Sequence, residues 1–282
     1  MNLLLLNPAE LTASHEEPGN TATVLLEDWR ATHIIRTLRA SCGDSIRVGI
    51  RNSTIGAGHI AELQPEHNRV VLQCEPKSFT IAPPAPCPAR LFVALPRPKA
   101  ARRVIRLAAE CGVKALHFIN GYKVEKSYWS SPLLSAAKID EQIVLGLQQA
   151  IDTKVPQVTL HTRFKPFVED ELPVLASGQP LLLAHPQHTP QDNFEDNRQN
   201  EPATNAQTLQ GALRALQYDA ANNGSVAALN VVLGPEGGFT AYELEKLQAC
   251  GAQPFNLGPR IYRTEIAIAT LLGELQALRS AQ

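Results

Sequence analysis

The chain has 282 residues, an apolar fraction of 44% and a formal net charge of −1. This length and apolar content predict a folded protein of two ordinary domains, each with a buried core. The apolar run Leu3–Leu6 lacks a basic flank and is too short for a signal segment, and no later run approaches membrane-spanning length. We therefore expect a cytoplasmic protein without a membrane partner.

The five cysteines are odd in number, scattered, and never in a C-x-x-C arrangement. That usage favours a reducing compartment and argues against structural zinc. His185 and His188 have a spacing found among metal ligands, but no cysteine or carboxylate stands at ligand spacing on a clear helix nearby. We expect no bound metal.

Charge is distributed unevenly along the chain. Residues 1–89 carry 7 basic and 9 acidic side chains, residues 90–165 carry 13 and 5, and residues 166–282 carry 6 and 13. The central segment therefore has a net charge of +8. Such a segment favours a phosphate-bearing partner, although a solvated surface would give the same pattern.

The sequence pattern of residues 1–76 predicts a small β-barrel, because short strand-like runs alternate with turn residues. The expected strands are Asn2–Leu6, Thr23–Leu26, Ser45–Ile50, His59–Leu63 and Val70–Cys74. A helical pattern over Asp28–Arg39 interrupts them and carries Arg36 and Arg39. This helix either presents its arginines outward to a partner or simply covers the open end of the barrel.

Residues 77–90 form a proline-rich stretch, which favours a stiff linker between two domains. Residues 91–282 then alternate apolar strand-like runs with helical stretches, so we expect an α/β domain with a parallel sheet. The expected strands are Leu91–Leu95, Ala115–Ile119, Val158–His161, Leu181–Ala184, Asn230–Leu233 and Phe255–Leu257. A polar stretch at about residues 186–207 is too long for an ordinary connection and is expected to be an insertion.

The predicted helix over Pro98–Glu110 carries much of the central positive charge. Its apolar residues form one stripe, and the opposite face gathers Lys99, Arg102, Arg103 and Arg106. This face is a candidate for RNA phosphate contacts. A solvent-facing helix side is the alternative.

Two glycine-rich loops follow predicted strands near the end of the chain. The first, Gly234–Gly238, runs into a helix whose start is specified by Thr240 and Glu243 as a capping box. The second contains Gly258 and leads into the last, apolar helix. Because ligands bind beyond the carboxyl ends of parallel strands, the two loops together predict a site for a flat ligand. They lack the dinucleotide fingerprint and the Gly-Lys-Ser/Thr of a phosphate loop, which disfavours a nucleoside triphosphate.

These loops carry a resemblance to a known family. The segments Val231–Thr240 (VVLGPEGGFT) and Asn256–Glu265 (NLGPRIYRTE) resemble the SPOUT-class uridine N3 methyltransferases of small-subunit ribosomal RNA (RsmE). His33–Arg39, followed by Gly43–Asp44, is similar to the family's N-terminal signature, and Ala109–Val113 is similar to its Glu-Leu-Gly-Val stretch.

The resemblance implies a PUA-like β-barrel that docks RNA, then a trefoil-knotted domain that binds S-adenosylmethionine and forms a homodimer on ribosomal RNA or the small subunit. Such knots are exceptions to the usual rules of chain topology. The cofactor-binding residues implied are His185, Leu233, Gly234, Pro235, Glu236, Gly237, Gly238, Leu257, Gly258, Ile261, Arg263 and Thr264.

For catalysis, we expect Arg263 and Arg260 to stabilise the uracil anion or fix its phosphate, and Glu265 to orient or accept the proton. The chain departs from the family pattern at four places that the resemblance places toward RNA: Leu107, residues 121–126, Asp152 and Tyr262. These departures leave two alternatives open. One is a catalytically silent RNA-binding factor for ribosome assembly, and the other is an unrelated α/β nucleotide-binding enzyme.

Overall fold

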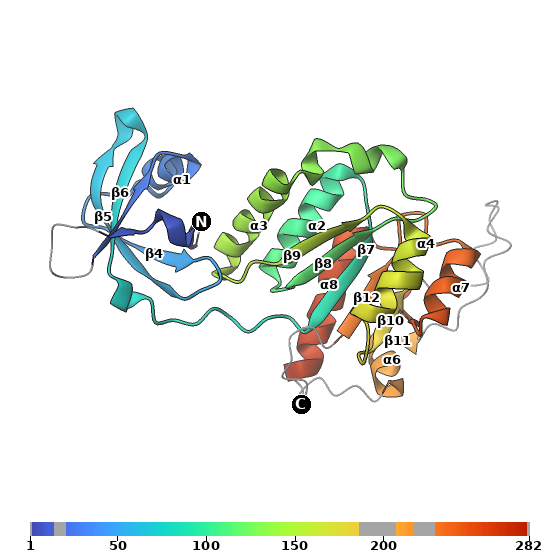
Figure 1. The fold of residues 1–282 in the computed structure, drawn as a ribbon. Coiled ribbons are helices and arrows are strands. Elements are labelled where there is room, and N and C mark those ends of the chain that lie inside the picture. Colours follow the sequence, from blue (N-terminus) through green and yellow to red (C-terminus); the bar gives the residue numbers. More distant parts are fainter. Residues whose placement is uncertain (1, 14–20, 186–206, 217–228, 281–282) are drawn as a thin grey trace. The chain divides into compact units, whose positions relative to one another are not determined.

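The protein, seen in a computed structural model that describes residues 2–13, 21–185, 207–216 and 229–280, divides into two compact units (Figure 1). The first unit comprises Met1–Ala85 together with Ile143–Val155, and the second comprises Pro86–Gln142 together with Pro156–Gln282. Most of the polar insertion expected at residues 186–207 lies outside the described residues.

Residues 143–155 belong to the first unit, whereas the sequence pattern places them in the second domain. Backbone hydrogen bonds across a hundred residues explain the difference. The Asn52 N–H donates to the Thr153 carbonyl (2.7 Å), and the Val155 N–H donates to Asn52 Oδ1 (2.9 Å). Asp152, expected to face RNA, is 3% exposed and accepts a hydrogen bond from the Lys154 N–H (2.8 Å).

The first unit is built on a six-stranded sheet in the order β1-β4-β5-β6-β3-β2, in which only the β1–β4 pair is parallel. Its strands are β1 (Leu4–Leu6), β2 (Thr12–Ala13), β3 (Ala22–Leu26), β4 (Ser45–Ile50), β5 (Ile55–Gln64) and β6 (Arg69–Cys74). Their inward side chains, including Leu6, Val24 and Leu72, form a buried apolar cluster. The five strands expected from the sequence are therefore confirmed, with shifted ends, and β2 is added.

The helix expected over residues 28–39 is present as α1 (Trp29–Thr32) continued by a π-helix (His33–Leu38). Asp28 caps its start by accepting a hydrogen bond from the Arg30 N–H (2.8 Å). Ile34 is buried in the core of the sheet, whereas Arg36 and Arg39 are exposed. The two arginines are therefore available for an external partner.

The second unit contains a seven-stranded sheet in the order β11-β13-β10-β12-β7-β8-β9, and every strand pair is parallel. The strands are β7 (Ala89–Ala94), β8 (Ala115–Ile119), β9 (Gln157–His161), β10 (Leu181–Ala184), β11 (Gln207–Thr208), β12 (Leu229–Leu233) and β13 (Gln253–Asn256). Central strands such as β12 are buried along their whole length, as expected for a sheet covered on both faces. The predicted α/β class with a parallel sheet is confirmed.

Helices lie on both faces of this sheet (Figure 1). The helices that belong wholly to this unit are α2 (Pro98–Glu110), α4 (Phe164–Pro166), a π-helix (Phe167–Glu171), α5 (Leu172–Leu175), α6 (Leu209–Ala215), α7 (Ala241–Ala249) and α8 (Thr264–Ser280). Helix α3 (Ala136–Ala150) begins in this unit, and its residues from Ile143 onward belong to the first. The helix predicted from Pro98 to Glu110 is thus confirmed at both ends, and it packs against α8.

Strand order places the two glycine-rich loops. The sequence pattern puts these loops on adjacent strands, but β10 lies between β12 and β13. Ala184, the last residue of β10, is paired with Leu233 on one side and Phe255 on the other. Three strand ends, rather than two, therefore meet at one edge of the sheet.

Candidate functional site

The loop after β12 is fixed from its far end by the cap of α7. The Glu243 N–H donates to Thr240 Oγ1 (3.3 Å), and the Thr240 N–H and hydroxyl donate to Glu243 Oε2 (2.8 and 2.9 Å). These contacts confirm the predicted capping box. Within the loop, Gly238 has φ +72 and donates its N–H to the Pro235 carbonyl (2.8 Å). The backbone therefore turns sharply and is held in one conformation.

The loop after β13 turns at Gly258, where φ is +97 and the N–H donates to Asn256 Oδ1 (3.0 Å). A residue with a side chain is strained at such a φ. The loop ends where α8 begins, and the Arg263 carbonyl accepts the N–H groups of Ile266 and Ala267 (both 2.9 Å). Arg263 itself is exposed.

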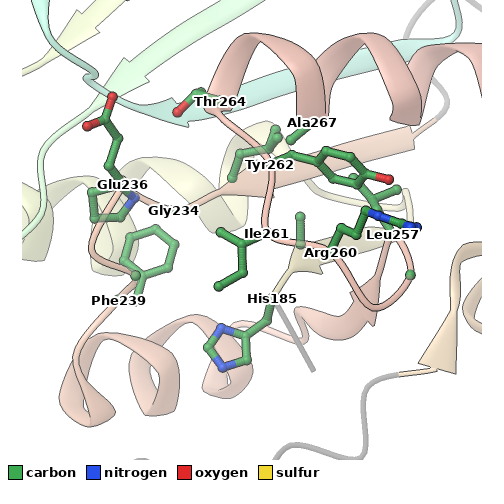
Figure 2. Close-up of a pocket in the computed structure, with 15 residues that line it drawn as sticks. His185, Gly234, Glu236, Phe239, Leu257, Arg260, Ile261, Tyr262, Thr264 and Ala267 are labelled. Atoms are coloured by element: carbon green, nitrogen blue, oxygen red, sulfur yellow. The ribbon is translucent and has the colours of Figure 1, made fainter. Parts of the chain in front are cut away.

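The two loops and the end of β10 enclose a hollow with about 750 Å³ between its walls, part of it open to solvent (Figure 2). Its lining residues are Ala184, His185, Leu233, Gly234, Pro235, Glu236, Gly238, Phe239, Leu257, Gly258, Arg260, Ile261, Tyr262, Thr264 and Ala267. At Gly238 and Gly258 a Cβ atom would enter open space. The walls therefore combine apolar side chains with bare backbone, which suits a flat, partly polar ligand.

The hollow brings together ten of the twelve residues expected to bind a cofactor, all except Gly237 and Arg263. Arg260, expected to be catalytic, also lines it. Sequence reasoning did not select Ala184, Phe239 or Ala267, and the resemblance placed Tyr262 toward RNA, whereas it also lines the hollow. Ala184 and Phe239 border chosen residues along the chain, and Ala267 follows Thr264 by one helical turn, so strand ends and helix periodicity would have found them.

Residues around the hollow form ion pairs and hydrogen bonds with neighbouring parts of the second unit. Glu236 lines the hollow and forms an ion pair with Arg97 (3.6 Å), with both side chains about half exposed. Gly237 is not among the lining residues, and its carbonyl accepts a hydrogen bond from Lys123 Nζ (2.6 Å). Glu265 lies outside the lining and pairs with Arg103 of α2 (3.3 Å), with its side chain 12% exposed.

The basic face predicted on α2 forms a second hollow. Arg102, Arg103 and Arg106 line it together with Leu107, Glu110 and Gln142. Arg106 Nη2 donates to Gln142 Oε1 (2.7 Å), which orients its guanidinium, whereas Lys99 is exposed and lies outside the lining. Three arginines thus line one hollow, and guanidinium groups bind phosphates through paired hydrogen bonds.

Within the described ranges, no three His, Cys, Asp or Glu side chains are grouped so that they could hold a metal ion. In the same ranges, no helix is both long and apolar enough to cross a bilayer.

Comparison with known families decides the assignment. The model of a family described as RNA methyltransferase domain matches residues 83–276, which is more than half of the chain. The chain belongs to the RNA methyltransferase domain family. The resemblance inferred from the two glycine-rich loops is therefore confirmed, and the matched residues include most of the second unit together with residues 143–155 of the first.

Two of the proteins similar to this chain carry the same name, ribosomal RNA small subunit methyltransferase E. Ribosomal RNA small subunit methyltransferase E of Treponema pallidum is 26% identical over 269 residues, which cover 95% of this chain and 87% of the relative. The crystal structure of a protein of the same name from Neisseria gonorrhoeae, bound to S-adenosyl methionine, has a TM-score of 0.67 at 19% identity and covers 99% of this chain and 98% of its own. A probable rRNA-methyltransferase from Porphyromonas gingivalis also has a TM-score of 0.67, at 18% identity, covering 100% and 99%. At these identities the structural likeness establishes the fold.

Proposed function

We propose that this protein transfers a methyl group from S-adenosylmethionine to N3 of a uridine in small-subunit ribosomal RNA, acting in the cytoplasm. The observation that carries this proposal is the hollow at the ends of β10, β12 and β13, whose walls come from the loops that carry the family resemblance. The names of the relatives support the choice of ribosomal RNA as substrate.

The residues of the hollow fit the proposed cofactor. Apolar side chains such as Leu233 and Leu257 suit the faces of an adenine ring, and the loop backbones supply donors and acceptors for its edge. The open space at Gly238 and Gly258 leaves room for a ligand to approach the backbone. S-adenosylmethionine supplies an activated methyl group on a sulfonium. The full proposed cofactor set is the one inferred from the sequence, including Gly237 and Arg263 at the rim.

Methylation of a uracil nitrogen requires a fixed acceptor and the loss of a weakly acidic proton. Arg260 lines the hollow, which supports the proposal that its guanidinium stabilises the negative charge developing on the base. We assign Arg263, at the start of α8, to the same task or to the phosphate of the target nucleotide. Glu265 is the proposed proton acceptor, and the target base leaves its stack to reach it.

The remaining parts of the proposal concern RNA and assembly. Residues 1–76 are proposed to form a PUA-like barrel that contacts RNA through Arg36 and Arg39, and residues 77–90 to link it to the catalytic domain at 91–282. Lys99, Arg102, Arg103 and Arg106 are proposed to contact RNA phosphates. The loops after β12 and β13 are proposed to belong to a trefoil knot, and the active form to be a homodimer.

Ile261 gives a test of the cofactor site that does not disturb the fold. Its side chain lines the hollow yet is 77% exposed, so Ile261→Ala removes ligand contact without opening the core. We expect this variant to bind S-adenosylmethionine about 5- to 10-fold more weakly, because alanine removes part of the apolar surface that would contact the ligand. Calorimetry measures the affinity. Ile266→Ala is the matched control because Ile266 is also exposed (48%) but lies outside the lining. Equal affinities for both variants and the unaltered protein would contradict this location of the site.

A further inference from the structure

The segment between β8 and α3 interleaves aromatic and basic residues close to the proposed methyl-transfer site. Tyr122, Lys123, Lys126, Tyr128 and Trp129 lie within eight consecutive residues. Tyr122 is 84% exposed, the highest exposure among the large apolar and aromatic side chains of the described residues that stand out at the surface. A single exposed aromatic ring is common at protein surfaces, so its significance depends on the groups around it and on how its backbone is held.

The backbone that carries Tyr122 is held rigidly. The Val124 N–H closes a turn onto the Gly121 carbonyl (3.0 Å), and Val124 is buried. Behind this turn, Asn120 accepts a hydrogen bond from Trp129 Nε1 (3.1 Å) and donates one to the Thr162 carbonyl (2.9 Å). An aromatic ring on a fixed backbone loses little conformational entropy when a partner stacks on it.

Two hydrogen bonds attach this turn to the loop after β12. The Tyr122 N–H donates to Glu243 Oε1 (2.6 Å), and the other oxygen of that carboxylate caps α7. Lys123 Nζ donates to the Gly237 carbonyl (2.6 Å), and the neighbours of Gly237 on both sides line the hollow. Glu243 is 2% exposed, so its carboxylate is shielded from competing water. The turn therefore keeps one position relative to the rim of the hollow.

We propose that Tyr122 is a stacking platform for a base of single-stranded RNA adjacent to the target nucleotide, an inference that rests on the proposed function. Glu243 and Lys123 are the positioning residues that hold Tyr122 there. Every base has a π face, so an aromatic ring binds unpaired bases with little regard to sequence. Basic residues beside it attract the backbone that links those bases. A base extruded from its stack leaves a neighbour that needs a new stacking partner, and Tyr122 supplies one.

The test uses the whole protein and a short oligouridylate that contains one 2-aminopurine, whose fluorescence is quenched on stacking. We expect quenching with the unaltered protein and with Tyr122→Phe, because phenylalanine keeps the ring. Tyr122→Ala should abolish quenching and weaken binding about 5- to 150-fold. Tyr242→Ala is the control, since Tyr242 is a half-exposed tyrosine whose ring already lies 5.8 Å from Lys246 Nζ.

Equal effects of Tyr122→Ala and Tyr242→Ala, or no quenching by the unaltered protein, would overturn the stacking proposal. Glu243→Gln adds a readout that separates positioning from contact. The Glu243→Gln variant still contains Tyr122 but should quench the 2-aminopurine fluorescence less. Adding Tyr122→Ala to that variant should cause little further loss of quenching. S-adenosylmethionine affinity of Tyr122→Ala should be unchanged. Absence of methyl transfer by a protein that still quenches 2-aminopurine would instead count against the proposed function.

Discussion

Arg103 on α2 and Glu265 in the first turn of α8 form an ion pair, with Nη1 and Oε1 3.3 Å apart. The pair joins the basic face of α2 to the helix that follows the second glycine-rich loop. Glu265 is directed toward α2 rather than into the lining of the hollow, although Thr264 beside it does line the hollow. A proton-accepting role for Glu265 therefore requires that it exchange its partner when RNA binds.

Substitutions can distinguish the roles of Glu265 and Arg103. If Glu265 accepts the proton, Glu265→Gln should lower kcat about 100-fold while cofactor affinity stays the same. Arg103→Gln should have a much smaller effect on kcat. Similar losses in both variants, with no further loss in the double variant, would assign Glu265 to holding α8 in place and would remove it from the chemistry.

Arg263 belongs to the proposed cofactor set, but its main role is predicted to be on the reacting base. Its side chain is exposed and lies outside the lining of the hollow, so Arg263→Ala should lower kcat about 100-fold and leave S-adenosylmethionine affinity nearly unchanged. Single-turnover kinetics and calorimetry on the same variant measure the two quantities. Parallel losses in turnover and affinity would make Arg263 a cofactor residue.

Gly258 is required by its backbone conformation. At φ +97 an alanine is strained by about 1–2 kcal/mol, so Gly258→Ala should distort the loop and weaken S-adenosylmethionine binding about 5- to 30-fold. Gly273→Ala is the control, because Gly273 lies inside α8 and its Cβ would contact nothing within 4 Å. That variant should bind normally and unfold at slightly higher temperature. Equal affinity of both variants would show that the loop after β13 does not shape the site.

Local patterns in the sequence predicted most of the strands and the capped start of α7, because alternation, turn residues and capping boxes act over a few residues. They did not place β10 between β12 and β13, since strand order depends on contacts between residues far apart in the chain. The consequence is specific: His185, expected from the resemblance to bind the cofactor, lines the hollow because it directly follows β10, which lies between the other two strands.

The same limit explains what sequence reasoning missed elsewhere. The sequence pattern predicts that Asp152 is a charge near RNA, but it is buried in the first unit, where the residues that follow it, 153–155, are hydrogen-bonded to Asn52. Glu265 reads as a residue of the second loop, and only the packing of α8 on α2 reveals Arg103 as its partner. Pairings over such distances leave no local signal in a single sequence.

The hollow on α2 predicts a salt-dependent contribution to RNA binding. Arg106 is oriented by Gln142, so Arg106→Gln should weaken binding of single-stranded RNA and reduce the slope of log affinity against log salt by about 1. Arg214→Gln makes the same charge change on the exposed surface of α6 and should leave the slope nearly unchanged. Identical slopes for the two variants would show that the hollow does not receive a phosphate.

His117 makes stability depend on pH. Burial, the neighbouring His161 and then Arg90 lower its pKa to about 4, and the imidazoles of His117 and His161 lie 3.0 Å apart. In the unfolded chain, His117 takes a proton as the pH falls through about 6.5, whereas in the folded protein it stays neutral in that range. Its contribution to stability is therefore present above pH 6.5 and is lost as pH falls toward 4. The loss is on the order of 2 to 3 kcal/mol.

Urea unfolding at about pH 7 and about pH 5 measures this effect. His117→Gln should reduce the loss of stability at the lower pH, because glutamine keeps a hydrogen-bonding group but does not titrate. His59→Gln, at an exposed histidine of the first unit, should keep the full loss. An unchanged pH dependence in His117→Gln would assign the effect to other groups.

The central claim is methyl transfer to uridine N3. Small ribosomal subunits that lack this mark are incubated with the protein and labelled S-adenosylmethionine, and the RNA is digested and analysed by nucleoside mass spectrometry. The account predicts labelled N3-methyluridine, and its loss in Glu265→Gln. Binding of S-adenosylmethionine without any labelled nucleoside would contradict the account and favour a catalytically silent RNA-binding protein.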